Sequence, residues 1–209
     1  MKEALKAIWL LEFKYGVATE NGIKKVLEVQ DIVETINELL KEGLIREIEN
    51  GYTLTKKGRE QIVVVVCGGV FDILHPGHGF ILEKAKELGD ILLVIVARDS
   101  TVKKMKRIPI VPEKQRLEMV GYLKPVDIAV LGKEGDFLDI IEEIRPDVIA
   151  LGPDQRHNED DIKATLKERG LEVEIKRIEE YRECPLHSTN DMLQKIIEMK
   201  YPHPPSEGE

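Results

Sequence analysis

The chain has 209 residues, of which 42% are hydrophobic and 33% are charged. This hydrophobic share supports a sizeable core and excludes an intrinsically disordered chain. With 31 Lys and Arg against 39 Asp and Glu, the net charge is -8. Such an acidic chain is a poor general binder of nucleic acid or anionic membranes, although a local basic patch could still bind phosphate.

The cysteine content and the hydropathy pattern bear on the compartment. The two cysteines, Cys67 and Cys184, are too few for a disulfide framework, and Cys67 lies in an apolar run. The longest apolar run, residues 62–67, is too short to span a bilayer, and no N-terminal signal pattern is present. We therefore expect a cytoplasmic protein with no membrane association.

The first sixty residues differ in pattern from the rest. Apolar residues recur at helical spacing in three stripes, at 4–13, 23–27 and 32–40, and Gly43 follows the third as a helix-ending glycine. Residues 44–48 and 52–55, joined by a turn at 49–51, read as a hairpin. Three helices and a hairpin are the layout of a winged helix, and the segment GLIREIENGYTLTKKGRE resembles the wing of many prokaryotic winged-helix domains. We predict a winged helix-turn-helix domain over residues 1–60.

After Gln61, β-branched runs alternate with helical patterns. Continuous apolar strands flanked by helices are typical of a parallel sheet buried on both faces. We predict a doubly wound α/β domain with a five-stranded parallel sheet over residues 61–200, followed by a disordered tail at 201–209. The expected strands are 62–66, 91–97, 128–131, 148–151 and 172–178; the expected helices are 80–88, 113–123, 137–144, 159–169 and 189–199.

The sharpest local signal is GGVFDILHPGH at residues 68–78, between the first strand and its helix. Ligands of open α/β sheets bind at the carboxyl ends of strands, and glycines let the backbone approach a ligand closely. His75 and His78 stand three residues apart at the helix start, so both imidazoles can face one phosphate beside the helix dipole. The alternatives are a metal pair, which lacks a third ligand nearby, and a plain surface turn.

This segment resembles the GxFDxxHxGH signature of the nucleotidyltransferase superfamily, which joins a nucleotide to a phosphorylated acceptor. Val70 stands where the family usually has Thr. The resemblance extends over residues 62–199 through the segments 97–102, 113–116, 152–155 and 184–189. It implies a Rossmann-like nucleotidyltransferase fold with His75, His78, Lys104 and Lys106 as catalytic residues. The residues that it implies for ATP binding are Gly69, Val70, Phe71, His75, Pro76, Gly77, His78, Gly152, Asp154, Tyr181, Ser188 and Thr189.

Several of these residues also have a simpler reading. Lys103, Lys104 and Lys106 could guide a triphosphate or acceptor, or form a solvated run of charges. Ser188 and Thr189 suit helix capping as well as phosphate binding. Asp154 could hold a ribose or base, or simply favour a turn, and Tyr181 could stack on a base or be structural.

The acceptor is expected to meet charged residues near the phosphate-binding segment. We predict that Asp72, Arg98 and Arg116 bind it. Arg116 has an alternative, which is to pair with Glu113 or Glu118 on its own helix.

Within the superfamily the chain looks most like the archaeal FAD synthetases, which adenylylate FMN. The segments VARDSTVKKMK, QRLEMV, LKPVD, LGPDQ and ECPLHST carry this likeness. It implies ATP and FMN as substrates, FAD and pyrophosphate as products, and Mg²⁺ bound with the triphosphate. The alternative is a cytidylyltransferase that makes CDP-glycerol or another CDP-alcohol from CTP. Against it, Pro185 and Leu186 replace the Glu and Gly of the RTEGIST-like motif of that branch. FAD synthetases also have two cysteines near the C-terminus, of which this chain keeps only Cys184.

A different class of function is a nucleotide-sensing regulator that binds DNA through the winged helix. The third expected helix disfavours it, because it carries Asp31, Glu34, Glu38 and Glu42 against the single base Lys41. We favour protein contact or dimerisation for this domain and expect a homodimer. Since every motif of the site follows Gln61, we also expect residues 61–209 to fold and catalyse alone.

Overall fold

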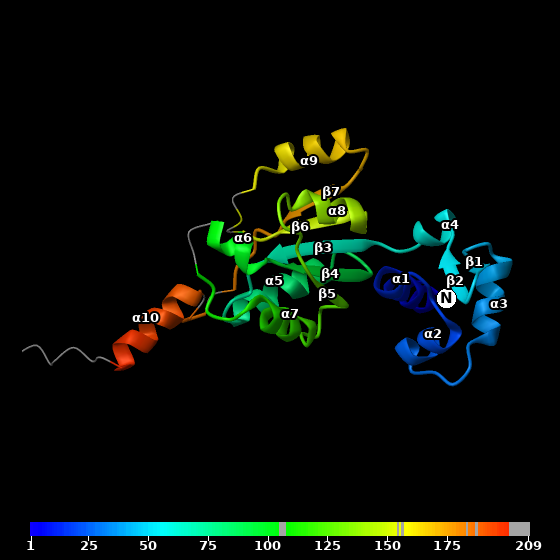
Figure 1. Ribbon diagram of the computed structural model, residues 1–209, viewed down its shortest axis with the longest axis horizontal. Helices are drawn as coiled ribbons and strands as arrows, with labels where there is room; N and C mark the ends of the chain where they lie inside the picture. Colours follow the sequence, from blue (N-terminus) through cyan, green and yellow to red (C-terminus); the bar gives the residue numbers. More distant parts are fainter. Residues whose placement is uncertain (105–107, 154, 156, 183, 187, 201–209) are drawn as a thin grey trace, which may run out of the picture.

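The computed structural model describes residues 1–104, 108–153, 155, 157–182, 184–186 and 188–200 (Figure 1). Two predicted site residues, Lys106 and Asp154, lie outside the described residues. The tail expected at 201–209 also lies outside them.

Residues 1–60, here called the N-terminal module, form helices packed on a small hairpin. The helix α1 buries the side chains of Leu5, Ile8 and Leu11, which recur at helical spacing. Gly43, with a φ of +66°, follows the third helix, because a left-handed residue ends a helix at little cost when it is glycine. The elements are α1 (Lys2–Tyr15), α2 (Glu20–Leu27), α3 (Val33–Lys41), the antiparallel β1 (Ile45–Ile48) and β2 (Gly51–Leu54), and α4 (Lys56–Arg59).

The rest of the chain is built on one parallel sheet of five strands, as predicted. Its order is β5-β4-β3-β6-β7, so the chain runs outward from β3 to one edge and then returns to β6 on the other side of β3. The carboxyl ends of β3 and β6 flank this reversal of direction, which is where open α/β sheets place their ligands. The strands are β3 (Val64–Gly69), β4 (Ile91–Val96), β5 (Ile128–Leu131), β6 (Val148–Leu151) and β7 (Glu174–Arg177).

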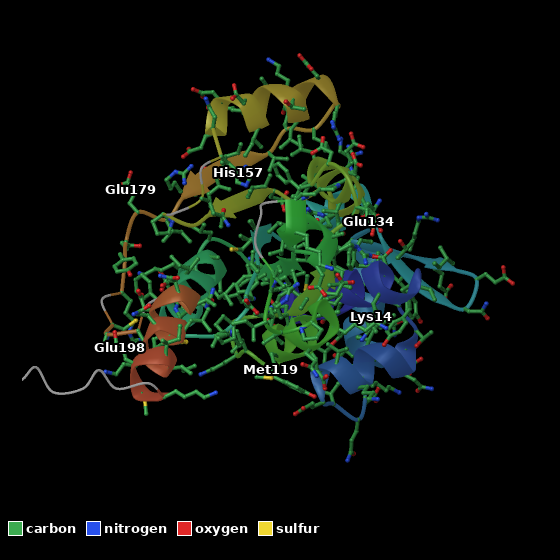
Figure 2. The ribbon with its side chains drawn as sticks, turned by 60° about the vertical axis from the view of Figure 1, so that its left-hand side comes forward. Lys14, Met119, Glu134, His157, Glu179 and Glu198 are labelled. Carbon is green, nitrogen blue, oxygen red and sulfur yellow. The ribbon has the colours of Figure 1, made fainter. Side chains whose placement is uncertain are left out.

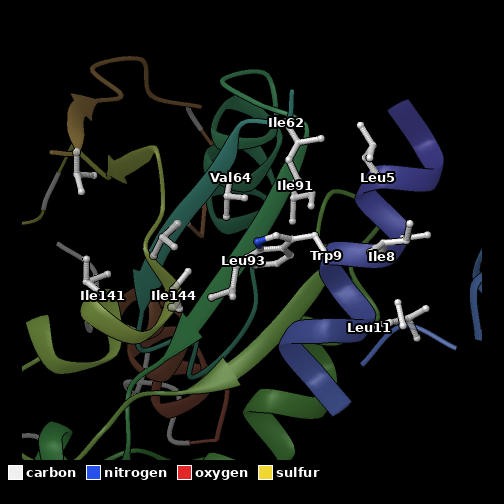
Figure 3. Close-up of a cluster of buried hydrophobic side chains, with 14 of the residues drawn as sticks. Leu5, Ile8, Trp9, Leu11, Ile62, Val64, Ile91, Leu93, Ile141 and Ile144 are labelled. Atoms are coloured by element: carbon white, nitrogen blue, oxygen red, sulfur yellow. The ribbon is translucent and has the colours of Figure 1, made fainter. Parts of the chain in front are cut away.

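Helices cover both faces of this sheet. Alternation along β4 divides the core: Leu92 packs in a cluster with residues of α5 and α7, whereas Leu93 packs in a cluster with residues of α8, α9 and α1. Figure 3 shows the second cluster, with α1 beside β4. The last helix, α10, lies apart from the sheet, and none of its residues is buried (Figure 1). The helices are α5 (Pro76–Lys86), α6 (Asp99–Lys104), α7 (Glu113–Gly121), α8 (Leu138–Ile144), α9 (Glu159–Glu168) and α10 (Thr189–Lys200).

The element boundaries differ from the prediction at the start of this domain. The first strand begins at Val64 rather than Ile62 and continues through Gly69. The helix after it begins at Pro76 rather than Phe80, because proline is favoured at the first helical position, where its missing N–H costs nothing. The short helices α4 and α6 were not predicted, since neither is long enough to show an apolar period. Within the described residues, no helix is long and apolar enough to cross a membrane.

Candidate active site

The loop between β3 and α5 takes an unusual backbone path. Phe71 is buried and has a φ of +52°, in the left-handed region that non-glycine residues rarely adopt. Its ring lies against Gly69, where an added Cβ would come within 2.8 Å of Phe71 Cε2. At Gly68 an added Cβ would meet only the Ile95 carbonyl oxygen, at 3.8 Å. Gly69 is therefore required by the ring of Phe71, while Gly68 leaves open space beside the backbone.

The two histidines of this loop come together at the N-terminus of α5. His75 is the extended residue before the helix, and Pro76 occupies its first turn. The ring centroids of His75 and His78 are 3.9 Å apart, and His78 also contacts Phe71 at 5.3 Å. Gly77 lies close to the His75 ring: a Cβ added at Gly77 would be only 3.0 Å from His75 Nδ1, which is tighter than an ordinary contact. The sequence therefore predicted correctly that both imidazoles gather at one helix N-terminus, an environment that favours anions.

A side chain that sequence reasoning passed over joins the two strands at the reversal of the sheet. The Gln155 amide nitrogen donates to the Gly68 carbonyl at 2.6 Å, and its oxygen accepts from the Gly152 amide at 3.3 Å. Arg177, at the end of β7, donates to the carbonyls of Gly152 at 3.0 Å and Gln155 at 2.9 Å. Gln155 and Arg177 thus hold the loop after β6 against the end of β3. Both residues lie at or just after the carboxyl end of a strand, and Gln155 also ends the segment LGPDQ that carries the family likeness.

The three residues predicted to bind the acceptor are instead bonded to protein. Asp72 accepts from the amides of Ile110 and Val111 at 3.0 and 2.8 Å. The Arg98 Nε donates to the Gly132 carbonyl at 2.6 Å. Arg116 is 1% exposed, which leaves its guanidinium group no access to a ligand. Acceptor binding by these three residues therefore stays a prediction, since the structure shows Arg116 buried and Asp72 and Arg98 bonded to backbone groups.

Arg116 ties together three segments, none of which is its own helix. Its guanidinium group donates to the carbonyls of Val111 and Val70 and forms an ion pair with Asp99 at 2.7 Å. The carboxylate that Arg116 pairs with is therefore Asp99, not Glu113 or Glu118 as the alternative had it. The Val70 carbonyl belongs to the loop between β3 and α5, residues 70–75, here called the histidine loop, so Arg116 fixes the start of that loop. A buried arginine is stable here because its donors meet carbonyls and a carboxylate.

The carboxylate partner of Arg116 also links the starts of α6 and α7. The Asp99 amide donates to Glu113 Oε2 at 2.7 Å, and the Glu113 amide donates to Asp99 Oδ2 at 3.3 Å, so each side chain caps the other helix. Partial burial alone would raise the pKa of Asp99, but the Arg116 and Glu113 bonds outweigh it and lower that pKa. The bonds to Arg116 and to the Glu113 amide therefore stabilise the ionised form of the Asp99 carboxylate.

Comparison with known proteins decides the family. The family described as cytidylyltransferase-like matches residues 66–195, which include the histidine loop, the loop after β6 and most of α10. The chain belongs to this family. An FAD synthase of Methanothermobacter marburgensis is 51% identical over 146 residues, which are 68% of this chain and 91% of that protein. An FAD synthase of Methanothermus fervidus is 55% identical over 136 residues, which are 64% of this chain and 94% of that protein.

A solved structure agrees with the family assignment. The lipopolysaccharide core biosynthesis protein of Thermoplasma volcanium is 45% identical, with a TM-score of 0.57. It matches 58% of this chain and 99% of its own. The likeness therefore covers more than half of this cytidylyltransferase-like protein and nearly all of its counterpart.

The other predicted ligand contacts of this nucleotidyltransferase lie on α6, between β7 and α10, and at the start of α10. Lys103 and Lys104 are exposed on the last turn of α6, and Tyr181 is 53% exposed. Ser188 accepts from the Asp191 amide at 3.1 Å and donates to the Asp191 carboxylate at 2.7 Å, which is a capping arrangement at the start of α10. Thr189, the first residue of that helix, is half-buried. Capping therefore describes Ser188 as the structure has it.

Neither cysteine nor any acidic cluster adds a metal centre among the described residues. No group of three or more His, Cys, Asp or Glu side chains in that part of the chain could hold a metal ion. Burial raises the pKa of the Cys67 thiol to about 12, which keeps it protonated and unreactive on β3. Cys184 is half-buried, and its thiol lies 3.7 Å from the Leu186 carbonyl.

Proposed function

We propose that the protein is an FMN adenylyltransferase, which converts FMN and ATP into FAD and pyrophosphate. The observation that carries this proposal is the identity of 48–55% to six archaeal FAD synthases, over at least 90% of each of those proteins. A phosphate oxygen of FMN attacks the α-phosphorus of ATP, the bond to the bridging oxygen of the β-phosphate breaks, and pyrophosphate leaves. No covalent intermediate on the enzyme is needed, because positioning and charge stabilisation suffice.

The histidine pair is proposed to hold the reacting phosphates. His75 and His78 lie 3.9 Å apart at the N-terminus of α5, where the helix dipole and two ring N–H donors favour the same anion. Gly69, Val70, Phe71, Pro76 and Gly77 shape the backbone that approaches the triphosphate. Lys104 and its neighbour Lys103 are exposed on α6, as side chains that guide an incoming phosphate must be. Lys106 keeps the same proposed role, although it lies outside the described residues.

The nucleoside end is proposed to lie at the loops after β6 and β7. Gly152 is held there by Gln155 and Arg177, which we propose as positioning residues rather than ligand contacts. Asp154, Tyr181, Ser188 and Thr189 remain the proposed contacts for the nucleotide. Asp72 and Arg98 are proposed to act on the acceptor indirectly, through the segments that they hold.

The divalent ion is proposed to be Mg²⁺ that enters as part of the substrate. The two histidines have no cluster of carboxylates around them within the described residues. A hard ion such as Mg²⁺ prefers oxygen ligands, and triphosphate oxygens provide them. Mg²⁺ on the triphosphate would neutralise charge on the leaving pyrophosphate.

For the N-terminal module we propose a winged-helix fold over residues 1–60, joined to a nucleotidyltransferase domain over 61–200. Supporting this, three helices precede the β1–β2 hairpin, and Ala18 pairs with Tyr52 as a third short strand position. We do not propose DNA binding. The outer face of α3 forms a groove lined by Asp31, Val33, Glu34, Asn37, Glu38 and Lys41, and three carboxylates there repel a phosphate backbone. The homodimer stays a prediction.

One assay tests the proposed reaction against the cytidylyltransferase alternative. The purified protein is incubated with Mg²⁺, with ATP or CTP, and with FMN, glycerol 3-phosphate, phosphoethanolamine or phosphopantetheine, and pyrophosphate release is measured. We expect release with ATP and FMN, weaker release with CTP and FMN, and none with glycerol 3-phosphate. Accumulation of CDP-glycerol without any FAD would overturn the proposal.

A further inference from the structure

The N-terminal module is joined to the sheet through two carboxylates with the same arrangement. Asp90, just before β4, accepts from the Val63 amide at 2.8 Å and pairs with Lys2 at 2.8 Å. Asp147, just before β6, accepts from the Val64 amide at 2.7 Å and pairs with Arg59 at 2.8 Å. Each carboxylate thus links the start of β3 to a neighbouring strand and to a cation of the module.

Between these two ion pairs, the contact is apolar. Leu5, Ile8 and Trp9 of α1 are buried in one cluster with Ile91 and Leu93 of β4. Figure 3 shows the Trp9 indole against Leu93 and Ile91. Ile141 and Ile144 of α8 belong to the same cluster and lie on the side of β4 away from α1. Trp9 is 7% exposed, so the sheet domain and the module share one continuous core.

The C-terminal end of α1 continues this contact along the sheet edge. Phe13 and Lys14 line a groove together with residues of α7 and β5. Figure 2 shows Lys14 on α1 and Met119 on α7 in neighbouring parts of the molecule. The helix therefore lies beside the half of the face formed by β4 and β5 (Figure 3). The groove residues of the sheet domain are Leu117, Gly121, Asp127, Ile128, Ala129 and Val130.

The FAD synthase relatives have no room for such a module. The match of 146 residues takes up 91% of one of them, and the match of 136 residues takes up 94% of the other. What remains in either protein is far shorter than sixty residues. The module is therefore an addition of this chain to a domain that its relatives have without it.

We propose that the N-terminal module is an intramolecular cover for the β4–β5 half of this sheet face. Without α1, a continuous apolar surface around Ile91, Leu93, Ile128 and Val130 would be exposed, and surfaces of that kind drive association. The occupant that would replace α1 is a second copy of the sheet domain, because the surface is apolar and the same on each copy. The histidine pair lies at the opposite, carboxyl ends of the strands, so the cover supplies stability without contributing to the site.

This role does not depend on the proposed reaction. It does oppose the expectation that residues 61–209 fold and catalyse alone, because their apolar face would then be exposed. Trp9 is the one tryptophan of the chain, so its fluorescence reports on this contact in the intact protein. Urea unfolding of the full chain is followed by Trp9 emission and by far-UV circular dichroism. We expect the two transitions to coincide, because module and sheet share a core. Emission that red-shifts fully before the circular dichroism changes would overturn the proposal.

A matched pair of substitutions on β4 separates the contact from general stability. Leu92 and Leu93 are adjacent and fully buried, but only Leu93 faces the module. We expect Leu93→Ala to red-shift native Trp9 emission and to move the fluorescence midpoint below the circular dichroism midpoint. Leu92→Ala should lower both midpoints together and leave the native emission unchanged. The same emission in both variants would contradict the proposal.

Cleavage of the folded chain tests the cover directly. A protease site is inserted between the exposed residues Glu60 and Gln61, the full chain is purified, and the cut protein is sized by light scattering. We expect the two fragments to co-elute. If they separate, the proposal requires the larger fragment to self-associate, and a larger fragment that stays monomeric and folded would overturn it.

Discussion

His75 and His78 owe their common direction to the residues around them. The extended backbone of His75 and the proline after it start α5 at a point that places the second imidazole one turn later on the same side. Phe71 packs against His78, and Gly77 leaves room for the ring of His75. Each imidazole is thus held by a specific neighbour, which is what preorganised charge stabilisation requires.

We expect His75→Ala and His78→Ala each to lower kcat by two or more orders of magnitude. Loss of one preorganised donor to developing phosphate charge typically costs about 3 kcal/mol. Steady-state kinetics with ATP and FMN measure the effect, and circular dichroism checks that the fold is intact. Near-normal turnover in both variants would exclude the histidines as phosphate ligands.

Two glycines on the same helix give a finer test of His75. A Cβ at Gly77 would lie 3.0 Å from His75 Nδ1, whereas a Cβ at Gly79 would meet nothing within 4 Å. We expect Gly77→Ala to displace the imidazole and lower kcat about tenfold or more, since small misplacements are costly. Gly79→Ala is the control and should stabilise the helix by up to about 1 kcal/mol. Equal kinetics in the two variants would show that the His75 position is not critical.

At the scale of elements, the site is a junction of four segments. The histidine loop, the segment after α6, and the starts of α6 and α7 meet at Arg116 and Asp99, which bond to each other and to backbone groups of the rest. On the other side of β3, Gln155 attaches the loop after β6. Loops held in this way can present ligand groups while the strands remain rigid.

We expect Arg116→Met to destabilise the protein by about 3 kcal/mol, because it leaves Asp99 and two carbonyls without their partner. Lys114→Met, at an exposed position of the same helix, is the control and should change stability by less than about 0.5 kcal/mol. Urea unfolding and steady-state kinetics distinguish the two possible roles of Arg116. A raised KM for FMN with unchanged stability would restore the acceptor-binding interpretation.

At the scale of the whole molecule, one apolar cluster runs from the N-terminal module through the sheet to α8 and α9. The carboxylates Asp90 and Asp147 close that cluster at the amino ends of the strands, where the module is attached. The loop that carries His75 lies at the carboxyl ends, away from this attachment. The attachment of the module and the proposed site therefore lie at opposite ends of the strands.

This arrangement makes the attachment sensitive to acid. Burial alone would raise the pKa of Asp90, but Lys2 and the Val63 amide lower it below its ordinary value. A lowered folded-state pKa adds stability that is fully present above the unfolded-state pKa of about 3.9 and is lost as the pH falls from there through the lower folded-state pKa. Urea unfolding at a series of pH values should therefore show wild type more stable than Asp90→Asn near pH 7. The difference should shrink as the pH falls below about 4. A difference that is constant from pH 7 to pH 3 would contradict this prediction.

The sequence by itself determined the features that depend on contiguous residues. Continuous apolar runs predicted the strands β3, β4 and β6, because a strand buried on both faces needs no distant information to be recognised. The motif at residues 68–78 predicted the histidine pair, since three residues of helix bring His75 and His78 together locally.

Only the tertiary structure decided which groups these elements meet. Arg116 pairs with Asp99, 17 residues away, and Gln155 bonds to Gly68 across 87 residues. Nothing in the local sequence around Arg116 distinguishes an arginine that contacts a ligand from a buried arginine that bonds to other segments of the protein, because both need the same charge and length of side chain. The target of α1 was hidden for the same reason: its apolar stripe shows that it must be covered, whereas its partner, β4, is set by how the two parts of the chain pack.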